Sequence, residues 1–205
     1  MRRLPLPMLS LGLVALLWAA PARADLVLSF NSPTYTTQVG QNVAVQVLLT
    51  QTPAGTQVDS LNTLLGTGVQ VTFNTPPGIA SVQSIVGGPA WDATSTSPTP
   101  STTSPITFAN SSLLGIGTIP GSGLLLATIT FQGLSPGVNV LNVRTLTPGA
   151  SFPTASGAFL DPTTIGTATL TVLVPEPASI IMAVTGLGAV IGGAAWRRAR
   201  GRSTV

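Results

Sequence analysis

Apolar and polar side chains alternate through the middle of this chain, and this period of two decides what it can fold into. Between positions 43 and 49 every odd residue is a valine or a leucine. Because successive side chains of a strand point to opposite faces of a sheet, such a stretch presents one face to a core and one to solvent. The same period recurs at 69–73, 125–132 and 167–174, whereas helical spacing is hardly found between 25 and 174.

Turn residues separate these alternating stretches. Glycine, proline and asparagine gather in short clusters at 39–42, 76–78, 120–123, 135–137 and 147–149, where they favour tight turns. Short strands divided by such turns predict an all-β fold with a single β-sandwich. The segment 94–105 contains only Ser, Thr and Pro, so we expect a low-complexity loop there.

The N-terminus has the features of an export signal. Arg2 and Arg3 precede an apolar stretch at 9–20, and Ala22-Arg23-Ala24 follows. The apolar stretch is shorter than the roughly 20 residues of a membrane span, and small residues at these positions suit signal peptidase. We therefore expect residues 1–24 to be removed as a signal peptide, which leaves Asp25 as the new N-terminus.

The C-terminus has the features of a membrane span. Residues 178–196 carry no charge, and as a helix they would extend roughly 28 Å, close to the hydrocarbon thickness of a bilayer. A basic cluster follows directly, and basic residues stay on the cytoplasmic side, so the preceding chain is expected outside the cytoplasm. The members of that cluster are Arg197, Arg198, Arg200 and Arg202.

A short motif stands just before the span. Pro175, Glu176 and Pro177, followed by the apolar span and the arginines, resemble the PEP-CTERM sorting signal of Gram-negative bacteria. The resemblance implies processing by an exosortase, a membrane-embedded cysteine transpeptidase-like enzyme, and an association with exopolysaccharide-producing cells. It also implies an inner-membrane intermediate, then residence at the cell surface, in the outer envelope or in the extracellular matrix. The alternative is an ordinary membrane anchor with a proline-rich stalk and no C-terminal processing.

These signals divide the chain into a signal peptide (1–24), an ectodomain (25–173) and a sorting signal (174–205). The net charge of +3 comes from the arginines of the terminal segments, because residues 25–174 hold one basic residue, Arg144, against four aspartates and carry −3. A nucleic-acid partner is not expected without clustered basic residues. The chain has no cysteine, so its stability must come from an apolar core rather than from disulfides.

Residues that perform chemistry are scarce in the ectodomain. It has no His, Cys or Lys, and its four aspartates are far apart in the sequence. We therefore expect no enzyme activity, catalytic residue, metal site or cofactor. A glycosidase-like pair among Asp59, Asp92 and Asp161 is the minor alternative; otherwise Asp92 is expected to anchor a loop and Asp161 to start a turn. Asn110-Ser111-Ser112 matches a glycosylation sequon.

The order of the alternating segments is similar to that of cohesin and carbohydrate-binding-module sandwiches. The similarity rests on 40–47, 68–74, 79–86 and 123–131, and it implies a cohesin-like or jelly-roll sandwich with binding or structural work. We expect a structural or adhesion protein of the cell surface or of an exopolysaccharide and biofilm matrix. The alternative is a carbohydrate-binding module, in which Tyr35 and Trp91 would stack on sugars; packing in the core or a loop is the competing role for both rings.

Overall fold

The computed structural model describes residues 25–52, 57–73 and 77–175. Within these ranges the chain forms eleven strands. They are β1 (Asp25–Phe30), β2 (Thr34–Gln38), β3 (Asn42–Thr52), β4 (Leu64–Thr72), β5 (Ala80–Gly87), β6 (Ala93–Thr96), β7 (Ile106–Ile116), β8 (Leu124–Gly133), β9 (Gly137–Thr145), β10 (Thr164–Ile165) and β11 (Thr167–Leu173).

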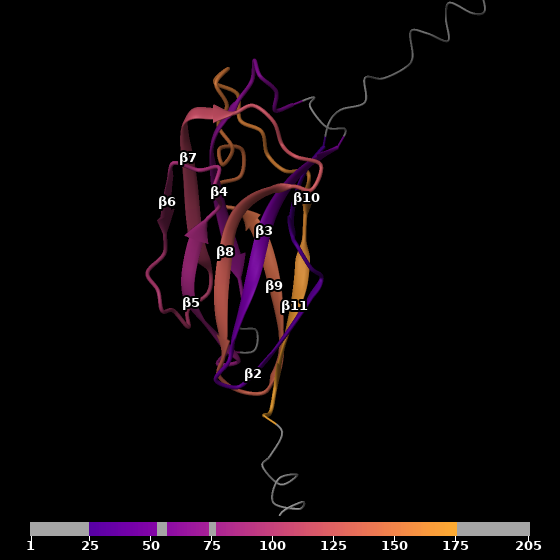
Figure 1. The fold of residues 1–205 in the computed structure, drawn as a ribbon, viewed down its shortest axis with the longest axis vertical. Coiled ribbons are helices and arrows are strands. Elements are labelled where there is room, and N and C mark those ends of the chain that lie inside the picture. The colour runs from indigo at the N-terminus through magenta and orange to yellow at the C-terminus, as the bar shows by residue number, and fades with distance from the viewer. Residues whose placement is uncertain (1–24, 53–56, 74–76, 176–205) are drawn as a thin grey trace, which may run out of the picture.

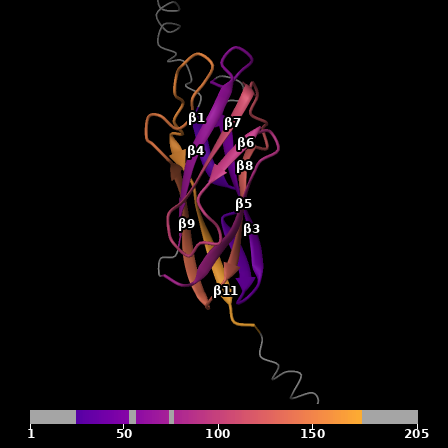
Figure 2. The same ribbon diagram turned by 90° about the vertical axis from the view of Figure 1, so that its left-hand side faces the viewer.

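The strands form two sheets that pack face to face (Figures 1 and 2). The five-stranded sheet has the order β10-β1-β3-β8-β5, and the six-stranded sheet has the order β2-β11-β9-β4-β7-β6. Most neighbours are antiparallel, whereas β1–β10 and β2–β11 are parallel. This arrangement confirms the prediction of an all-β fold with a single β-sandwich.

The core lies between the sheets and follows the alternation of the sequence. Val45, Val47 and Leu49 of β3 are fully buried, as are Ile129 and Phe131 of β8. The ring of Phe131 meets that of Phe73 edge to face, with 5.3 Å between the ring centroids. Such geometry is favourable for aromatic pairs. The contact joins the two sheets, because Phe131 lies in β8 and Phe73 directly follows β4 in the opposite sheet.

A bulge interrupts the alternation in β8. The β3–β8 register skips one residue of β8 between Val47 and Leu48, and consequently Leu126 and Ala127, although adjacent, are both fully buried. In a bulge, two residues of one strand lie opposite a single residue of its neighbour, and this interrupts the strict period of two. The extra apolar side chain is thereby directed into the core.

Different segments of the chain meet at the two ends of the sandwich. Asp25 pairs with Thr52 at the end of β3, whereas β11 ends beside β2, just before the start of β3. Since β3 has 11 residues, these ends lie about 35 Å apart. We name the end that carries the loops 57–63, 117–123 and 146–163 and the last residues of β7 the distal pole, because β11 runs out of the domain at the other end (Figure 1).

The Ser/Thr/Pro-rich segment differs from the expected loop. Residues 93–96 form the edge strand β6, which pairs with β7. Ser101 then exchanges two backbone hydrogen bonds of 2.7 and 2.8 Å with Val82 of β5, so the segment crosses from one sheet to the other. Threonine is β-branched and suits an exposed edge strand, and for that reason a composition typical of loops here forms a strand.

The predicted terminal segments lie outside the described residues. This applies to the signal peptide at 1–24 and to the span at 178–196. In the part of the chain that the structure describes, no helix is long and apolar enough to cross a membrane.

Candidate functional site

The residues of the predicted sorting signal fall at the border of the described chain. Pro175 is exposed and follows β11 at the end opposite the distal pole. Glu176, Pro177 and the four tail arginines lie outside the described residues, as do Ala22 and Ala24. Asp25 is the exposed first residue of β1, so cleavage before it would leave the first strand intact. The two processing sites stay predictions.

Tyr35 is a core residue rather than an exposed platform. Its side chain is 8% exposed, its hydroxyl donates to Asn31 Oδ1, and the same hydroxyl accepts a hydrogen bond from the Ser32 backbone at 3.1 Å. Burial raises the pKa of the Tyr35 hydroxyl above its ordinary value. The hydroxyl therefore fixes the turn between β1 and β2.

Trp91 has an equivalent structural role between β5 and β6. It is 8% exposed, and its indole Nε1 donates to the backbone oxygen of Leu125 at 3.1 Å. A buried indole needs such a partner. Both candidate rings are thus buried, and both pack inside the domain, which was the alternative to stacking on sugars.

The aspartates hold loops in place. Asp59 Oδ1 accepts hydrogen bonds of 2.8 Å from the backbone of Leu61 and Asn62. Asp92 Oδ2 accepts one of 2.7 Å from the backbone of Leu113. Asp161 Oδ2 accepts one from the backbone of Gly149. Among the described residues no three His, Cys, Asp or Glu side chains come together as a metal site.

Asn110, the first residue of the sequon, links the two sheets from inside. It is 5% exposed, and its Nδ2 donates to Thr67 Oγ1 at 3.1 Å and to the backbone oxygen of Leu126 at 3.0 Å. Its Oδ1 accepts from Thr94 Oγ1 at 2.8 Å. The amide is therefore a buried structural group that connects β4, β6 and β7 to β8.

Replacing Asn110 with alanine should lower the free energy of unfolding by about 1–3 kcal/mol, because it removes three buried hydrogen bonds and leaves Thr67 and Thr94 without them. Thermal unfolding followed by circular dichroism measures the change. Ser112→Ala is the matched control, since it destroys the sequon but leaves the buried amide. Equal destabilisation by both variants would show that the amide has no special structural role.

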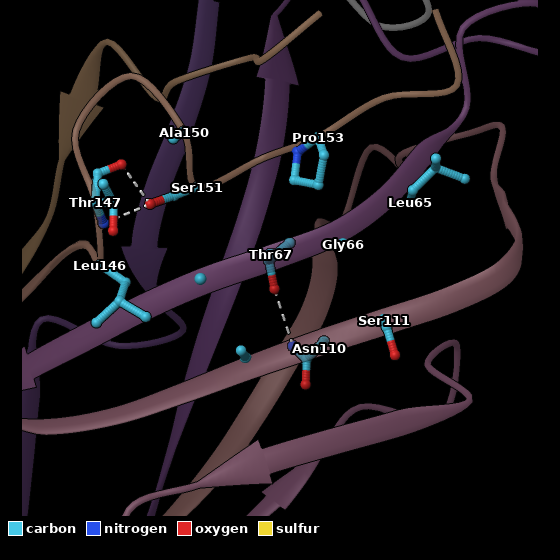
Figure 3. Close-up of a pocket in the computed structure, with 12 residues that line it drawn as sticks. Leu65, Gly66, Thr67, Asn110, Ser111, Leu146, Thr147, Ala150, Ser151 and Pro153 are labelled. Atoms are coloured by element: carbon cyan, nitrogen blue, oxygen red, sulfur yellow. Dashed lines mark hydrogen bonds between the residues drawn. The ribbon is translucent and has the colours of Figure 1, made fainter. Parts of the chain in front are cut away.

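A small hollow lies over the six-stranded sheet near the distal pole (Figure 3). It has a volume of about 300 Å³ and is bounded by β4, β7 and the loop after β9. The Ser151 hydroxyl donates to the Thr147 carbonyl and accepts from the Thr147 backbone N–H, both at 2.7 Å. A Cβ atom on Gly66 would lie 2.9 Å from the backbone oxygen of Asn110, so only glycine fits there. No charged side chain lines this hollow.

A larger hollow, which we name the Arg144 hollow, lies on the other side of Leu146. Its volume is about 610 Å³. Arg144 is exposed on β9, and among the described residues it forms no ion pair with a carboxylate. The hollow is lined by Gln70, Asn142, Arg144, Thr145, Leu146, Pro148, Asp161, Pro162, Ile165 and Thr167.

Sequence reasoning missed a group of exposed leucines at the distal pole. Leu61, Leu113 and Leu114 are 90%, 90% and 91% exposed. The β4–β7 register passes from Leu64↔Ile116 to Gly66↔Ser111, so residues 112–115 bulge out of the ladder. The sequence pattern at 112–115 is that of a strand that continues, and no local signal predicts the bulge.

The leucine-bearing loops are held against each other. Gly115 has a φ of +74°, and a Cβ atom there would lie 2.2 Å from Thr63 Oγ1, so the bulge touches the loop that carries Leu61. Asp59 and Asp92 bind the backbone at Leu61 and Leu113. The three side chains are therefore presented on fixed turns.

Comparison with solved structures identifies the fold. The sixth cohesin of scaffoldin B from Acetivibrio cellulolyticus, solved in complex with a dockerin, aligns with a TM-score of 0.50 at 13% identity, covering 73% of this chain and 99% of the cohesin. The sandwich has a cohesin-like fold. At this identity the similarity shows the fold alone.

Other cohesins align with lower scores. The cohesin–dockerin complex from Clostridium thermocellum gives a TM-score of 0.47 at 12% identity, with 73% of this chain and 99% of the other covered. The seventh type I cohesin of ScaB from Pseudobacteroides cellulosolvens gives 0.46 at 13%, with 74% and 94% covered. No protein-family model matches the sequence, and no curated protein matches it.

Proposed function

We propose that this chain is an exported, non-enzymatic adhesion or structural protein whose distal pole binds another protein at the cell surface or in the extracellular matrix. The tail would direct it there through exosortase processing, and the two opposite ends of the sandwich would separate processing from binding. The cohesin-like fold supports such a role, because the sixth cohesin of scaffoldin B from Acetivibrio cellulolyticus was solved in complex with a dockerin.

The leucines of the distal pole carry the proposal. Burial of a leucine side chain contributes about 1.5–3 kcal/mol. A partner that covers the three exposed leucines would therefore gain a large favourable free energy of binding. Large apolar side chains gathered and exposed at one end of a domain are typical of interaction sites. The partner we infer is a protein with a complementary apolar surface. Since β11 runs out at the opposite end, processing of the tail would leave the pole free to hold the protein at the surface or in the matrix.

Replacing Leu61, Leu113 and Leu114 with serine should release the protein into the medium while leaving its processing unchanged. The variants would be expressed as full-length chains in a Gram-negative host that carries an exosortase, and the retained fraction would be measured in the cell and matrix fractions. Because the three side chains are exposed, the melting temperature should hardly change.

Val138→Thr with Val140→Thr is the matched control for this experiment. Both valines are exposed, 54% and 46%, on β9 rather than on the leucine-bearing loops. The control protein should be retained like the wild type. Retention of the leucine variant at the wild-type level would overturn the proposed protein-binding pole.

A further inference from the structure

We propose that the Arg144 hollow binds a carboxylate-bearing sugar unit of an acidic polysaccharide. The lining of this hollow does not include Leu61, Leu113 or Leu114, so the proposal goes beyond the protein-binding role and does not depend on it. The hollow has about 610 Å³, within the range of about 300–1,000 Å³ that small-molecule sites occupy.

Regular strands form the floor of the hollow, and a loop forms its wall. Gln70 of β4, Asn142 of β9 and Thr167 of β11 alternate with the buried residues of their strands and therefore point away from the core. Pro148 and Pro162 belong to the loop that follows β9. Proline restricts the backbone, and the bond from the Gly149 N–H to Asp161 Oδ2 ties two parts of this loop together. The site is thus built before a ligand arrives.

The charge of the hollow selects an anion with a single negative charge. Arg144 is the one cation of residues 25–175, and its guanidinium matches a carboxylate with two parallel hydrogen bonds. Asp161 adds one negative charge to the same hollow. Asp161 repels a doubly charged phosphate about twice as strongly as a singly charged carboxylate, and the single charge of Arg144 balances only the carboxylate.

Asp161 also offers an acceptor. Its Oδ2 accepts one hydrogen bond, from the Gly149 N–H, and a carboxylate oxygen can accept a second. A ligand hydroxyl, directly or through a bridging water, would supply that second donor. Hydroxyl donors are abundant on sugars and absent from simple carboxylates.

The remaining lining groups also suit a sugar. The amides of Gln70 and Asn142 and the hydroxyls of Thr145 and Thr167 each donate and accept, as sugar hydroxyl groups do. Pro148, Pro162 and Ile165 provide apolar surface for the C–H face of a ring.

A peptide ligand fits this surface less well. Extended peptides commonly bind by pairing with a free sheet edge. Here β9 pairs with both β11 and β4, and β4 pairs with both β9 and β7. The floor of the hollow therefore has no free edge, and recognition must proceed through side chains.

Binding of uronate oligosaccharides to the full-length protein in detergent tests the proposal. The probes are hexamers of galacturonate, mannuronate and glucuronate, with the galacturonate methyl ester and a neutral glucose hexamer for comparison, all measured by calorimetry. At least one uronate hexamer should bind, and its affinity should fall with salt. Arg144→Gln should weaken binding by about 10-fold or more, as expected for a lost charge-assisted pair.

Three further variants make the outcome decisive. Val140→Thr, on the same strand, is the matched control and should bind like the wild type. Arg144→Lys keeps the charge without the bidentate geometry and should bind more weakly than the wild type. The leucine variant of the distal pole should bind sugar normally, so failure of one proposal is distinguishable from failure of the other.

Three results would overturn the proposal. They are the absence of binding to every uronate hexamer, equal binding by Arg144→Gln, and equal binding of the methyl ester. Binding of polyglutamate as strong as that of the uronates would show that the hollow recognises charge alone, and the saccharide assignment would then be wrong.

Discussion

Protein that has lost only its signal peptide should accumulate in the inner membrane when Glu176 is replaced by alanine. If Pro175-Glu176-Pro177 is a recognition peptide, its loss blocks exosortase processing, while the apolar span at 178–196 still inserts. In a host that carries the cognate enzyme, we expect the released form to fall to background and the uncleaved form to replace it. Immunoblots of inner-membrane, outer-membrane and medium fractions measure this change.

Neutralising the four tail arginines should give a different defect. Arg197, Arg198, Arg200 and Arg202 set the orientation of the span, so their replacement should impair membrane topology rather than recognition of the motif. Protease accessibility of the ectodomain in spheroplasts separates the two defects. If Glu176→Ala and Pro175→Ala proteins are processed and released like the wild type, the motif is only a stalk, and the ordinary membrane anchor replaces the sorting signal.

Replacing Phe131 with alanine should cause the largest loss of stability. Phe131 is fully buried and packs edge to face on Phe73, and Phe→Ala substitutions in cores cost about 3–5 kcal/mol. For a domain of about 150 residues this corresponds to a melting temperature lowered by roughly 8–20 °C. Thermal unfolding followed by circular dichroism at the β-sheet minimum measures it.

Phe159→Ala is the matched control for this prediction, because it makes the same chemical change at a site that is 53% exposed. It should lower the melting temperature by a few degrees at most. Equal losses for the two variants would contradict the assignment of Phe131 to the centre of the core.

The period of two predicted the core strands well. The odd-numbered residues from Val45 to Leu49 are buried in β3, and Ala168, Leu170 and Val172 are buried in β11, as their alternation indicates. This succeeds because the pleat of a single strand imposes the period locally. Val174 continues the same alternation but is 61% exposed, since β11 ends at Leu173 and no opposing sheet covers the next residue.

Edge pairing and bulges were not predictable. The segment from residue 93 to residue 96 pairs with β7 although its composition is typical of a loop, and the bulge at 112–115 turns Leu113 and Leu114 outward. Both features depend on which strand lies alongside, and a local pattern carries no information about that neighbour.

By itself, the sequence determined the fold class and the scarcity of reactive side chains in the ectodomain. These properties depend on composition and on the alternation of apolar and polar residues over a few positions. The tertiary structure decided that Tyr35, Trp91 and Asn110 are buried, that three leucines are exposed on one pole, and that Gln70, Arg144 and Asp161 line one hollow. Those outcomes depend on strand order and register, which bring together residues as far as 137 positions apart, such as Leu26 and Thr163, and only the packing of the strands selects that order.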